Sequence, residues 1–244
     1  MKLIYRLYQL FVAAPILLVL TIVASLFTIV GCTFFDASWW SYNPGRWWSR
    51  AVVRVLQLPV KVEGREHLDA HQSYVIIPNH QGVFDIFLIY GFLGRQFKWM
   101  MKEELRQMPL VGKACESSGY IFVDQKGGPK KLQQMHDQAR SVLQDGVSLV
   151  VFPEGARTWD GSLGRFKRGA FQLANELQLP LLPITINGSF QILPRARGYV
   201  NFVDWHPLTM TIHPALPPSE PTDEAERQLM QQAHDIIEQR IERD

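Results

Sequence analysis

The sequence predicts an α/β protein: a mixed, mainly parallel sheet flanked by helices, preceded by a hydrophobic helical segment at the N-terminus. From residue 60 onward, short runs rich in β-branched and aromatic residues alternate with helical ones, as in a sheet covered by helices. Residues 74–77 and 148–152 are nearly continuous apolar runs, which is typical of strands buried on both faces. The 244 residues, 47% of them hydrophobic, are enough to build one large domain with a proper core.

The expected elements follow in chain order. Strands are predicted at 60–63, 74–77, 97–101, 120–124, 148–152, 181–186 and 208–212. Helices are predicted at 85–93, 110–117, 129–143, 169–177 and 222–243. The last helix has a good start signal, because Pro221 and Thr222 precede the acidic pair Asp223 and Glu224.

The composition argues against several classes of protein. A formal net charge of +2 does not suit a nucleic-acid-binding arm or tail, so no nucleic-acid partner is expected. The two cysteines, Cys32 and Cys115, lack metal-site spacing, and we expect neither a structural disulfide nor an oxidising compartment. The histidines outside the candidate site show no ligand spacing either, so no metal is expected.

The N-terminal region holds a long hydrophobic segment. Residues 7–35 contain no charged side chain, and 10–30 is long enough to cross about 30 Å of hydrocarbon as a helix. Three interpretations compete: a membrane anchor or span, a fully buried core helix, or a signal peptide with Lys2 and Arg6 at its start and Cys32 in a lipoprotein-like cleavage box. The apolar run is long for a signal peptide, which favours the membrane anchor.

Basic and aromatic residues flank the segment. Both flanks are basic, so the positive-inside rule gives no orientation, and a segment that enters the membrane and returns, kinked at Pro15, fits the pattern. A predicted interfacial collar combines four tryptophans with two arginines: Trp39, Trp40, Trp47, Trp48, Arg46 and Arg50. The alternative is that these aromatic side chains pack on the folded domain. We therefore expect a membrane-anchoring helical segment at 1–58 and a second, catalytic part at 59–244.

The first candidate for chemistry directly follows the strand at 74–77. In Asn79-His80-Gln81-Gly82-Val83-Phe84-Asp85, the break at Gln81-Gly82 lets His80 lie on a strand-end loop while Asp85 lies in the first helical turn. The carboxylate can then accept a proton from one imidazole nitrogen and leave the other as a general base. The alternative is a loop histidine beside an ordinary acidic residue at a helix start.

The second candidate follows the strand at 148–152. Phe152-Pro153-Glu154-Gly155-Ala156-Arg157-Thr158 combines a glycine that allows close backbone approach with an arginine that suits phosphate. Three further basic residues precede the helix at 169–177, and a helix start with basic neighbours is a plausible phosphate site: Arg165, Lys167 and Arg168. The alternative is a solvated charge cluster.

Together these residues resemble the glycerolipid acyltransferases. His80 and Asp85 are similar to the family's H-x4-D motif, and the run from Phe152 to Arg157 is similar to its F-P-E-G-x-R motif. Shorter matches to other family segments lie at Lys102, Glu104, Leu105, Pro109 and Gly112, at 119–124, at 166–169, and at 182–184, where Pro183 resembles the proline of the fourth motif. The closest type is 1-acyl-sn-glycerol-3-phosphate acyltransferase, which makes phosphatidic acid.

Two positions depart from the family pattern. Gln125, followed by Lys126, stands where the family usually has an arginine that is thought to hold the acceptor phosphate. Lys126 is therefore a candidate substitute, and another lysolipid acceptor stays open. Ala156 stands where threonine or serine is common. A membrane-anchored lipid-binding protein without turnover is the alternative from another class.

The resemblance implies a reaction and roles for these residues. His80 would take the proton of the acceptor hydroxyl, oriented by Asp85, and the alkoxide would attack the thioester of acyl-CoA or acyl-acyl carrier protein without an acyl-enzyme. The implied substrate-binding residues are Asn79, Glu154, Gly155, Arg157, Lys126, Arg165, Lys167, Arg168 and Pro183. No cofactor is expected beyond the thioester co-substrate. Expected partners are the bilayer, a lysophospholipid and the donor, and the expected location is the cytoplasmic face of the inner membrane.

Overall fold

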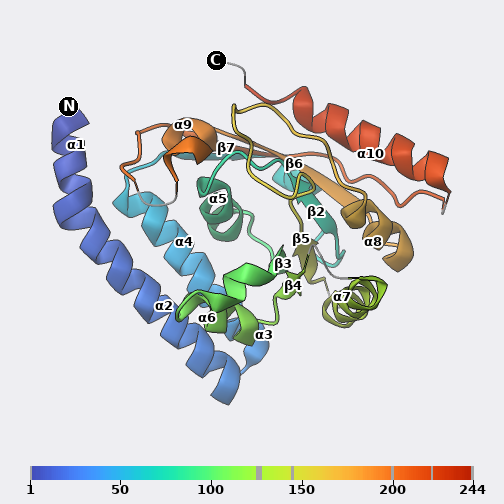
Figure 1. Cartoon of the computed structure of the whole chain (residues 1–244), viewed down its shortest axis with the longest axis horizontal. Helices are drawn as coiled ribbons and strands as arrows, with labels where there is room; N and C mark the ends of the chain where they lie inside the picture. The colour runs from blue at the N-terminus through green and yellow to red at the C-terminus, as the bar shows by residue number, and fades with distance from the viewer. Residues whose placement is uncertain (1, 125–127, 144–145, 199–200, 221, 243–244) are drawn as a thin grey trace.

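A seven-stranded sheet forms the centre of the protein (Figure 1). The computed structural model describes residues 2–124, 128–143, 146–198, 201–220 and 222–242. Its strand order is β1-β7-β6-β2-β5-β3-β4, and all neighbours are parallel except the antiparallel pair β6 and β7. The predicted mixed, mainly parallel sheet is therefore confirmed. The strands are β1 (Val60–Glu63), β2 (Val75–Pro78), β3 (Phe97–Lys102), β4 (Ile121–Val123), β5 (Ser148–Val150), β6 (Leu181–Asn187) and β7 (Leu208–Ile212).

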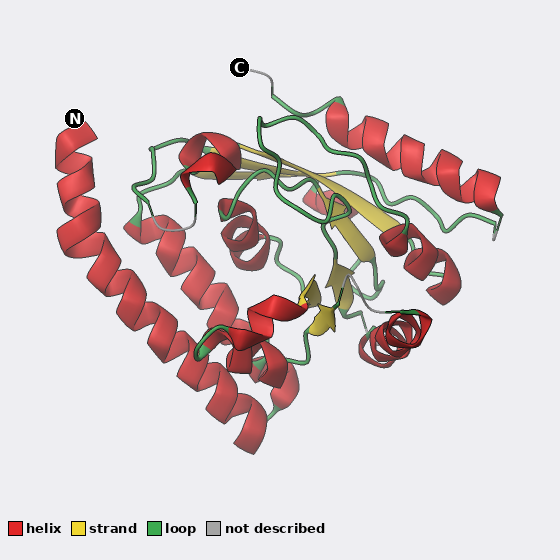
Figure 2. Ribbon diagram, viewed as in Figure 1, coloured by secondary structure: helices red, strands yellow, loops and turns green. Residues whose placement is uncertain are grey.

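Helices cover both faces of this sheet (Figure 2). The α-helices are α1 (Lys2–Tyr8), α2 (Ala14–Phe34), α3 (Ala37–Trp40), α4 (Asn43–Val55), α5 (Phe84–Phe92), α6 (Val111–Ser117), α7 (Pro129–Val142), α8 (Gly169–Leu177), α9 (Ser189–Ile192) and α10 (Asp223–Glu238). A π-helical turn, η1 (Gln9–Ala13), joins α1 to α2, and short 3₁₀ turns are η2 (Arg65–His67), η3 (Glu103–Gln107) and η4 (Arg195–Arg197). All five helices predicted after residue 60 are present, whereas α3, α4 and α9 were not predicted individually.

The last helix is shorter than predicted, because it ends at Glu238 and not at residue 243. Asn187, at the end of β6, donates from Nδ2 to the carbonyl of Arg240 and accepts the backbone N–H of Glu242 on Oδ1, at 2.9 and 3.0 Å. These backbone groups therefore bond to the sheet, and the chain leaves the helical path.

The central strand β2 contributes to a core on each face of the sheet. Ile76 joins the cluster that includes Leu88 of α5, while Val75 and Ile77 join the opposite cluster with Phe171 of α8. All of these side chains are fully buried. This alternation follows from the two-residue period of a strand, and burial on both faces explains the continuous apolar run that the sequence shows.

The N-terminal segment forms one continuous helical rod from Lys2 to Phe34, drawn in blue along one side of Figure 1. It is long and apolar enough to cross a membrane, and only 11% of its most apolar stretch is buried. Its exposed side chains include Leu10, Phe11, Val19 and Phe27. The interpretation of this segment as a fully buried core helix is therefore wrong.

Specific polar contacts join this rod to the rest of the chain. The buried amide of Gln9 donates to the carbonyl of Val203 and accepts its N–H, both at 2.9 Å. The tyrosine hydroxyls of Tyr5 and Tyr8 donate to backbone carbonyls at the end of α4. The wide π-helical turn lies directly before Pro15, where the proline ring would clash with the carbonyl of a regular α-helical turn.

The four tryptophans of the predicted collar divide into two pairs. Trp39 and Trp47 are 38% and 52% exposed and contact each other edge to face, with centroids 5.3 Å apart. Trp40 packs against α2, and Trp48 packs on Phe87 of α5. The exposure that an interfacial position requires is therefore present at Trp39 and Trp47, while the other two follow the alternative of packing inward.

Candidate functional site

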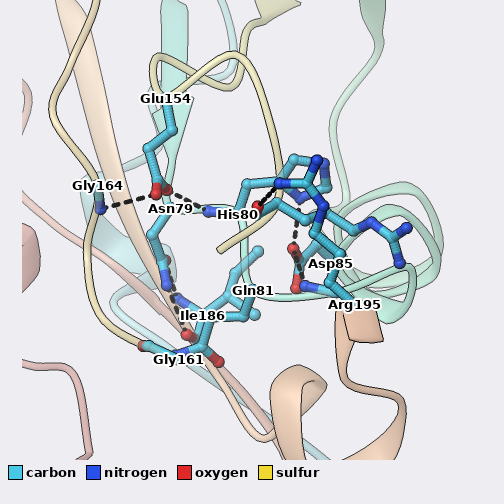
Figure 3. A network of polar contacts seen from close by, with 11 residues as sticks. Asn79, His80, Gln81, Asp85, Glu154, Gly161, Gly164, Ile186 and Arg195 are labelled. Carbon is cyan, nitrogen blue, oxygen red and sulfur yellow. Dashed lines mark hydrogen bonds and ion pairs between the residues drawn. The ribbon is translucent and has the colours of Figure 1, made fainter. Parts of the chain in front are cut away.

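The two predicted motifs meet at one edge of the sheet. Strands β2 and β5 are parallel neighbours, with Ile76 opposite Val150, so the loops that follow them leave the sheet side by side. Pro78 ends β2 and His80 follows it, whereas Glu154 lies in the loop after β5. Figure 3 shows the polar network that results. This edge, outside the carboxyl ends of parallel strands, is where α/β proteins place their ligands.

His80 and Asp85 form a close pair, as the break between them predicts. Helix α5 begins at Phe84, so His80 is on the loop and Asp85 in the first helical turn. Nδ1 of His80 lies 2.7 Å from Oδ2 of Asp85, and the same oxygen accepts the backbone N–H of Gly82 at 2.9 Å. Asp85 is fully buried and the His80 side chain is 15% exposed. Because a carboxylate can only accept, Nδ1 carries the proton and Nε2 is left as a base.

A stack of aromatic rings fixes the plane of the imidazole. The His80 ring lies over Phe152 with centroids 3.8 Å apart and planes 15° apart. Phe152 in turn stacks on Trp99 of β3 at 5.9 Å. One edge of the imidazole is thus held by Asp85 and one face by Phe152, so the ring direction is set before any substrate binds.

Glu154 connects the two strand-end loops. Its Oε1 accepts the backbone N–H of His80 at 2.6 Å, and its Oε2 accepts that of Gly164 at 2.8 Å (Figure 3). Burial raises the pKa of Glu154 to about 7, while these two N–H groups act in the opposite direction. The sequence assigned Glu154 to substrate binding. Each oxygen accepts one backbone N–H, so the carboxylate holds the two loops together, and its predicted contact with substrate stays a prediction.

The side chain of Asn79 bonds to the neighbouring strand β6. Its side chain is 1% exposed, and its amide donates to the carbonyl of Ile186 and accepts the N–H of the same residue, at 2.9 and 2.7 Å. Both polar atoms of this buried side chain pair with β6, and its predicted substrate contact stays a prediction. Asn79 fixes the point at which the chain leaves β2 for His80.

The basic residues in and after the second motif differ in how close they lie to His80 and Gly155. Gly155 has a φ of +72°, and a side chain there would lie 2.5 Å from Nζ of Lys167, so this amine lies directly over the glycine backbone. The N–H of Thr158 donates to the carbonyl of His80 at 2.9 Å, which brings the adjacent Arg157 to the site. Arg165 and Lys167 are exposed.

Arg168 points elsewhere. Its guanidinium forms ion pairs with Asp223 and Glu226 of α10, both at 2.6 Å. These two ion pairs join α8 to α10 and direct the guanidinium toward α10, and the predicted phosphate contact of Arg168 stays a prediction. Pro183 lies buried in β6, opposite Ile77 of β2. Lys126, like Gln125, lies outside the described residues.

Three residues of this network were not singled out for a site role by the sequence. A side chain at Gly82 would lie 2.4 Å from the hydroxyl oxygen of Ser189 and 2.7 Å from its carbonyl oxygen. Gly164 supplies the second N–H to Glu154, and Arg195 donates to the carbonyl of Arg157 at 2.7 Å. The glycines carry a weak signal, since each interrupts a motif loop, but nothing in the sequence connects Arg195 to position 157.

The chain matches known proteins over the same region. A family model described as Acyltransferase matches residues 59–187, more than half of the chain. The human 1-acyl-sn-glycerol-3-phosphate acyltransferase alpha is 37% identical over 128 residues, which are 52% of this chain and 45% of that protein. The chloroplastic 1-acyl-sn-glycerol-3-phosphate acyltransferase LPAT1 of Arabidopsis thaliana is 32% identical over 144 residues, 58% of this chain and 40% of that protein. The matches thus span less than half the length of these relatives.

One solved structure matches nearly the whole chain. The crystal structure of the 1-acyl-sn-glycerophosphate (LPA) acyltransferase PlsC from Thermotoga maritima superimposes with a TM-score of 0.78 at 24% identity. The match covers 97% of this chain and 93% of that one, so the fold extends to the N-terminal helices. The strand order, the two motifs at one sheet edge and the family match agree, and this chain belongs to the acyltransferase family.

Proposed function

We propose that this protein transfers an acyl group from a thioester to the 2-hydroxyl of 1-acyl-sn-glycerol-3-phosphate, giving phosphatidic acid for phospholipid synthesis. The observation that carries the proposal is the pair of His80 and Asp85, at 2.7 Å, held beside the loop of Glu154 and Arg157. The relatives named as 1-acyl-sn-glycerol-3-phosphate acyltransferases support the choice of acceptor.

The geometry suggests the course of the reaction. Nε2 of His80 takes the proton of the acceptor hydroxyl as the oxygen attacks the carbonyl carbon of the thioester. Asp85 stabilises the imidazolium that forms, because its buried carboxylate accepts a hydrogen bond from the Nδ1–H group. The new ester bond forms, the C–S bond breaks, and the imidazolium returns the proton to the thiolate. The reaction requires no cofactor beyond the thioester itself.

Cationic residues beside the base would hold the acceptor phosphate. Arg157 reaches the site through the contact of Thr158 with His80, and the amine of Lys167 lies over Gly155. A guanidinium and an ammonium group are suited to a phosphate dianion. Glu154 contributes indirectly, by holding the loop that carries His80.

We further propose that the N-terminal rod places this site at a membrane surface. Its exposed apolar side chains and the exposed pair Trp39 and Trp47 suit burial in a lipid leaflet and at the headgroup level. Through α4 the rod connects to α5, the helix that carries Asp85. Both acceptor and product are lipids, whereas acyl-CoA and acyl-acyl carrier protein are cytosolic, which favours the cytoplasmic face of the inner membrane.

Acyl transfer by purified protein in detergent tests the proposal. Lysophosphatidic acid is supplied with radiolabelled acyl-CoA or acyl-acyl carrier protein, and His80→Ala is assayed beside the wild type. Phosphatidic acid that forms with the wild type and not with the variant supports the reaction and the base, and the active donor identifies the carrier. No product from folded wild-type protein with either donor would contradict the proposal. Product with a different lysolipid alone would correct the acceptor, as Gln125 allows.

A further inference from the structure

Arg195 brings a second guanidinium group to the site from outside the family match. It begins the short turn η4 after α9, beyond residue 187. Its Nη1 donates to the backbone carbonyl of Arg157 at 2.7 Å. Its Cζ lies 4.0 Å from the centroid of the Trp159 ring, within the range of a cation–π contact. Figure 3 shows Arg195 in the same polar network as His80 and Asp85.

The point of attachment places this cation close to the catalytic base. The carbonyl that Arg195 binds belongs to the same peptide group as the N–H of Thr158, which donates to the carbonyl of His80 at 2.9 Å. Two hydrogen bonds and one peptide unit therefore separate the guanidinium of Arg195 from the backbone of His80. Because peptide groups are planar and rigid, this chain of contacts fixes the guanidinium relative to the backbone of the loop that carries His80.

The immediate surroundings of Arg195 are those of a ligand-binding cation. No residue in the described part of the chain forms an ion pair with it, whereas Arg197, two positions later, pairs with Asp204 at 2.6 Å. A guanidinium carries five N–H donors, and one donor of Arg195 is used within the described residues.

We propose that Arg195 binds a phosphate group of a substrate together with Arg157, with Trp159 holding the guanidinium in place. This inference rests on the proposed function. Such a phosphate is present on the glycerol of the acceptor and on the donor, in coenzyme A or in the phosphopantetheine group of acyl carrier protein. The geometry assigns the chemistry of the ligand, and the experiment separates its source.

The test compares Arg195→Gln with the wild type on substrates with and without phosphate. Lysophosphatidic acid is compared with 1-monoacylglycerol as acceptor, and acyl-CoA with S-acyl-pantetheine as donor. Loss of one charge-assisted hydrogen bond to phosphate raises the KM for the phosphorylated substrate by about 10- to 100-fold. The kcat with saturating substrate changes little, so the preference for the phosphorylated substrate falls. The substrate whose KM rises identifies the phosphate that Arg195 binds.

Two further variants make the test specific. Arg197→Gln is the matched control, because it removes the same charge from the same turn and leaves the site contacts in place. Trp159→Leu removes the ring under the guanidinium and raises the same KM by about 2- to 5-fold. An equal loss of activity on all substrate pairs would overturn the proposal, as would an unchanged KM for both phosphorylated substrates in Arg195→Gln.

A binding measurement keeps this inference separate from the acyl-transfer reaction. Lysophosphatidic acid and coenzyme A are titrated against the wild type and Arg195→Gln, and the rise in melting temperature is recorded. We expect one of the two ligands to stabilise the wild type and to lose most of that effect in the variant. Failure of acyl transfer would contradict the proposed function alone, whereas identical shifts in both proteins would overturn the role of Arg195.

Discussion

The substitution Glu154→Gln tests whether Glu154 holds the loop of His80 in place or binds substrate. The carboxylate accepts the N–H groups of His80 and Gly164 at 2.6 and 2.8 Å. A glutamine has one acceptor oxygen, so its NH₂ group would face the other N–H donor to donor. A buried N–H without an acceptor costs about 1–3 kcal/mol. At about 2 kcal/mol, the melting temperature falls by about 4–8 °C for a chain of this length.

The same substitution has a distinct kinetic signature. The N–H that loses its acceptor belongs to the backbone of His80 or to the facing loop at Gly164, so the base is displaced. A shift of about 1 Å at a catalytic group lowers the rate on the order of 100-fold. If the Glu154 carboxylate holds the loops and does not contact the acceptor, kcat falls by about 10- to 100-fold with little change in the KM for lysophosphatidic acid.

The assay is run at pH 8, where Glu154, with its pKa raised to about 7 by burial, is ionised. Radiolabelled acyl transfer gives kcat and KM, and circular dichroism in the same detergent gives the melting temperature. Glu116→Gln is the control, because its carboxylate is 42% exposed and pairs only with side chains on the surface, and we expect no measurable change. A raised acceptor KM with normal kcat and melting temperature in Glu154→Gln would refute the reasoning and return Glu154 to substrate binding.

Three other predictions follow from the described contacts. Asp85→Asn presents an amide to Nδ1 of His80 and favours the wrong tautomer, so kcat in the acyl-transfer assay falls on the order of 10³–10⁴-fold while the fold, checked by circular dichroism, is kept. Gly82→Ala places a methyl group 2.7 Å from the backbone oxygen of Ser189, so the loop shifts and kcat falls by about 10-fold or more; an unchanged kcat would contradict the close contact. Burial lowers the pKa of His213 to about 4, below its usual 6.5, so its neutral form stabilises the fold above pH 6.5 and this stability is lost as the pH falls toward 4. Other groups, Glu154 among them, titrate in the same range, so the quantity to measure is the difference in free energy of unfolding in urea between wild type and His213→Asn, which falls by about 2 kcal/mol from pH 7 to pH 5.

The sequence predicted the sheet and the histidine–aspartate pair because both depend on local patterns. A strand buried on both faces reads as a continuous apolar run, and β2 and β5 are read in this way. The contact of His80 with Asp85 spans five residues, and the break at Gly82 before α5 is sufficient to predict it. The rule that ligands bind beyond the carboxyl ends of strands then places both motifs at one edge.

The roles of Glu154, Asn79 and Arg168 could not be predicted in the same way. Glu154 and Asn79 bond to backbone groups 74 and 107 positions away, and every residue type offers the same backbone groups. Arg168 pairs with acidic residues at the start of α10, and the sequence reads those residues equally well as helix-start charges. A polar residue inside a functional motif is thus easily predicted to contact substrate when its contacts in the structure are with other parts of the chain.

For the N-terminal segment, the side of the helix that packs on the domain could not be predicted from the sequence. Apolar residues surround the whole circumference of α2, so the sequence gives no stripe that indicates which side packs against the domain. The side that packs is marked by small and polar residues, Ser25, Thr28 and Gly31, which are the buried residues of this helix. The side of α2 that packs on the domain is therefore the less hydrophobic one, which is the pattern expected of a helix that faces lipid.

The contacts of Asp85, Phe152 and Glu154 set the orientation of His80. The imidazole is held at one edge by Asp85 and on one face by Phe152, and its backbone is held by Glu154. None of these contacts uses a substrate atom, so the base is oriented in the free protein and loses little freedom when the acceptor binds. In the proposed reaction, phosphate would be bound by the cationic residues on the facing loops, which are exposed or only partly buried. We therefore expect substitutions of the residues that hold His80 to lower kcat, and substitutions of the cationic residues to raise the KM of the phosphorylated substrate.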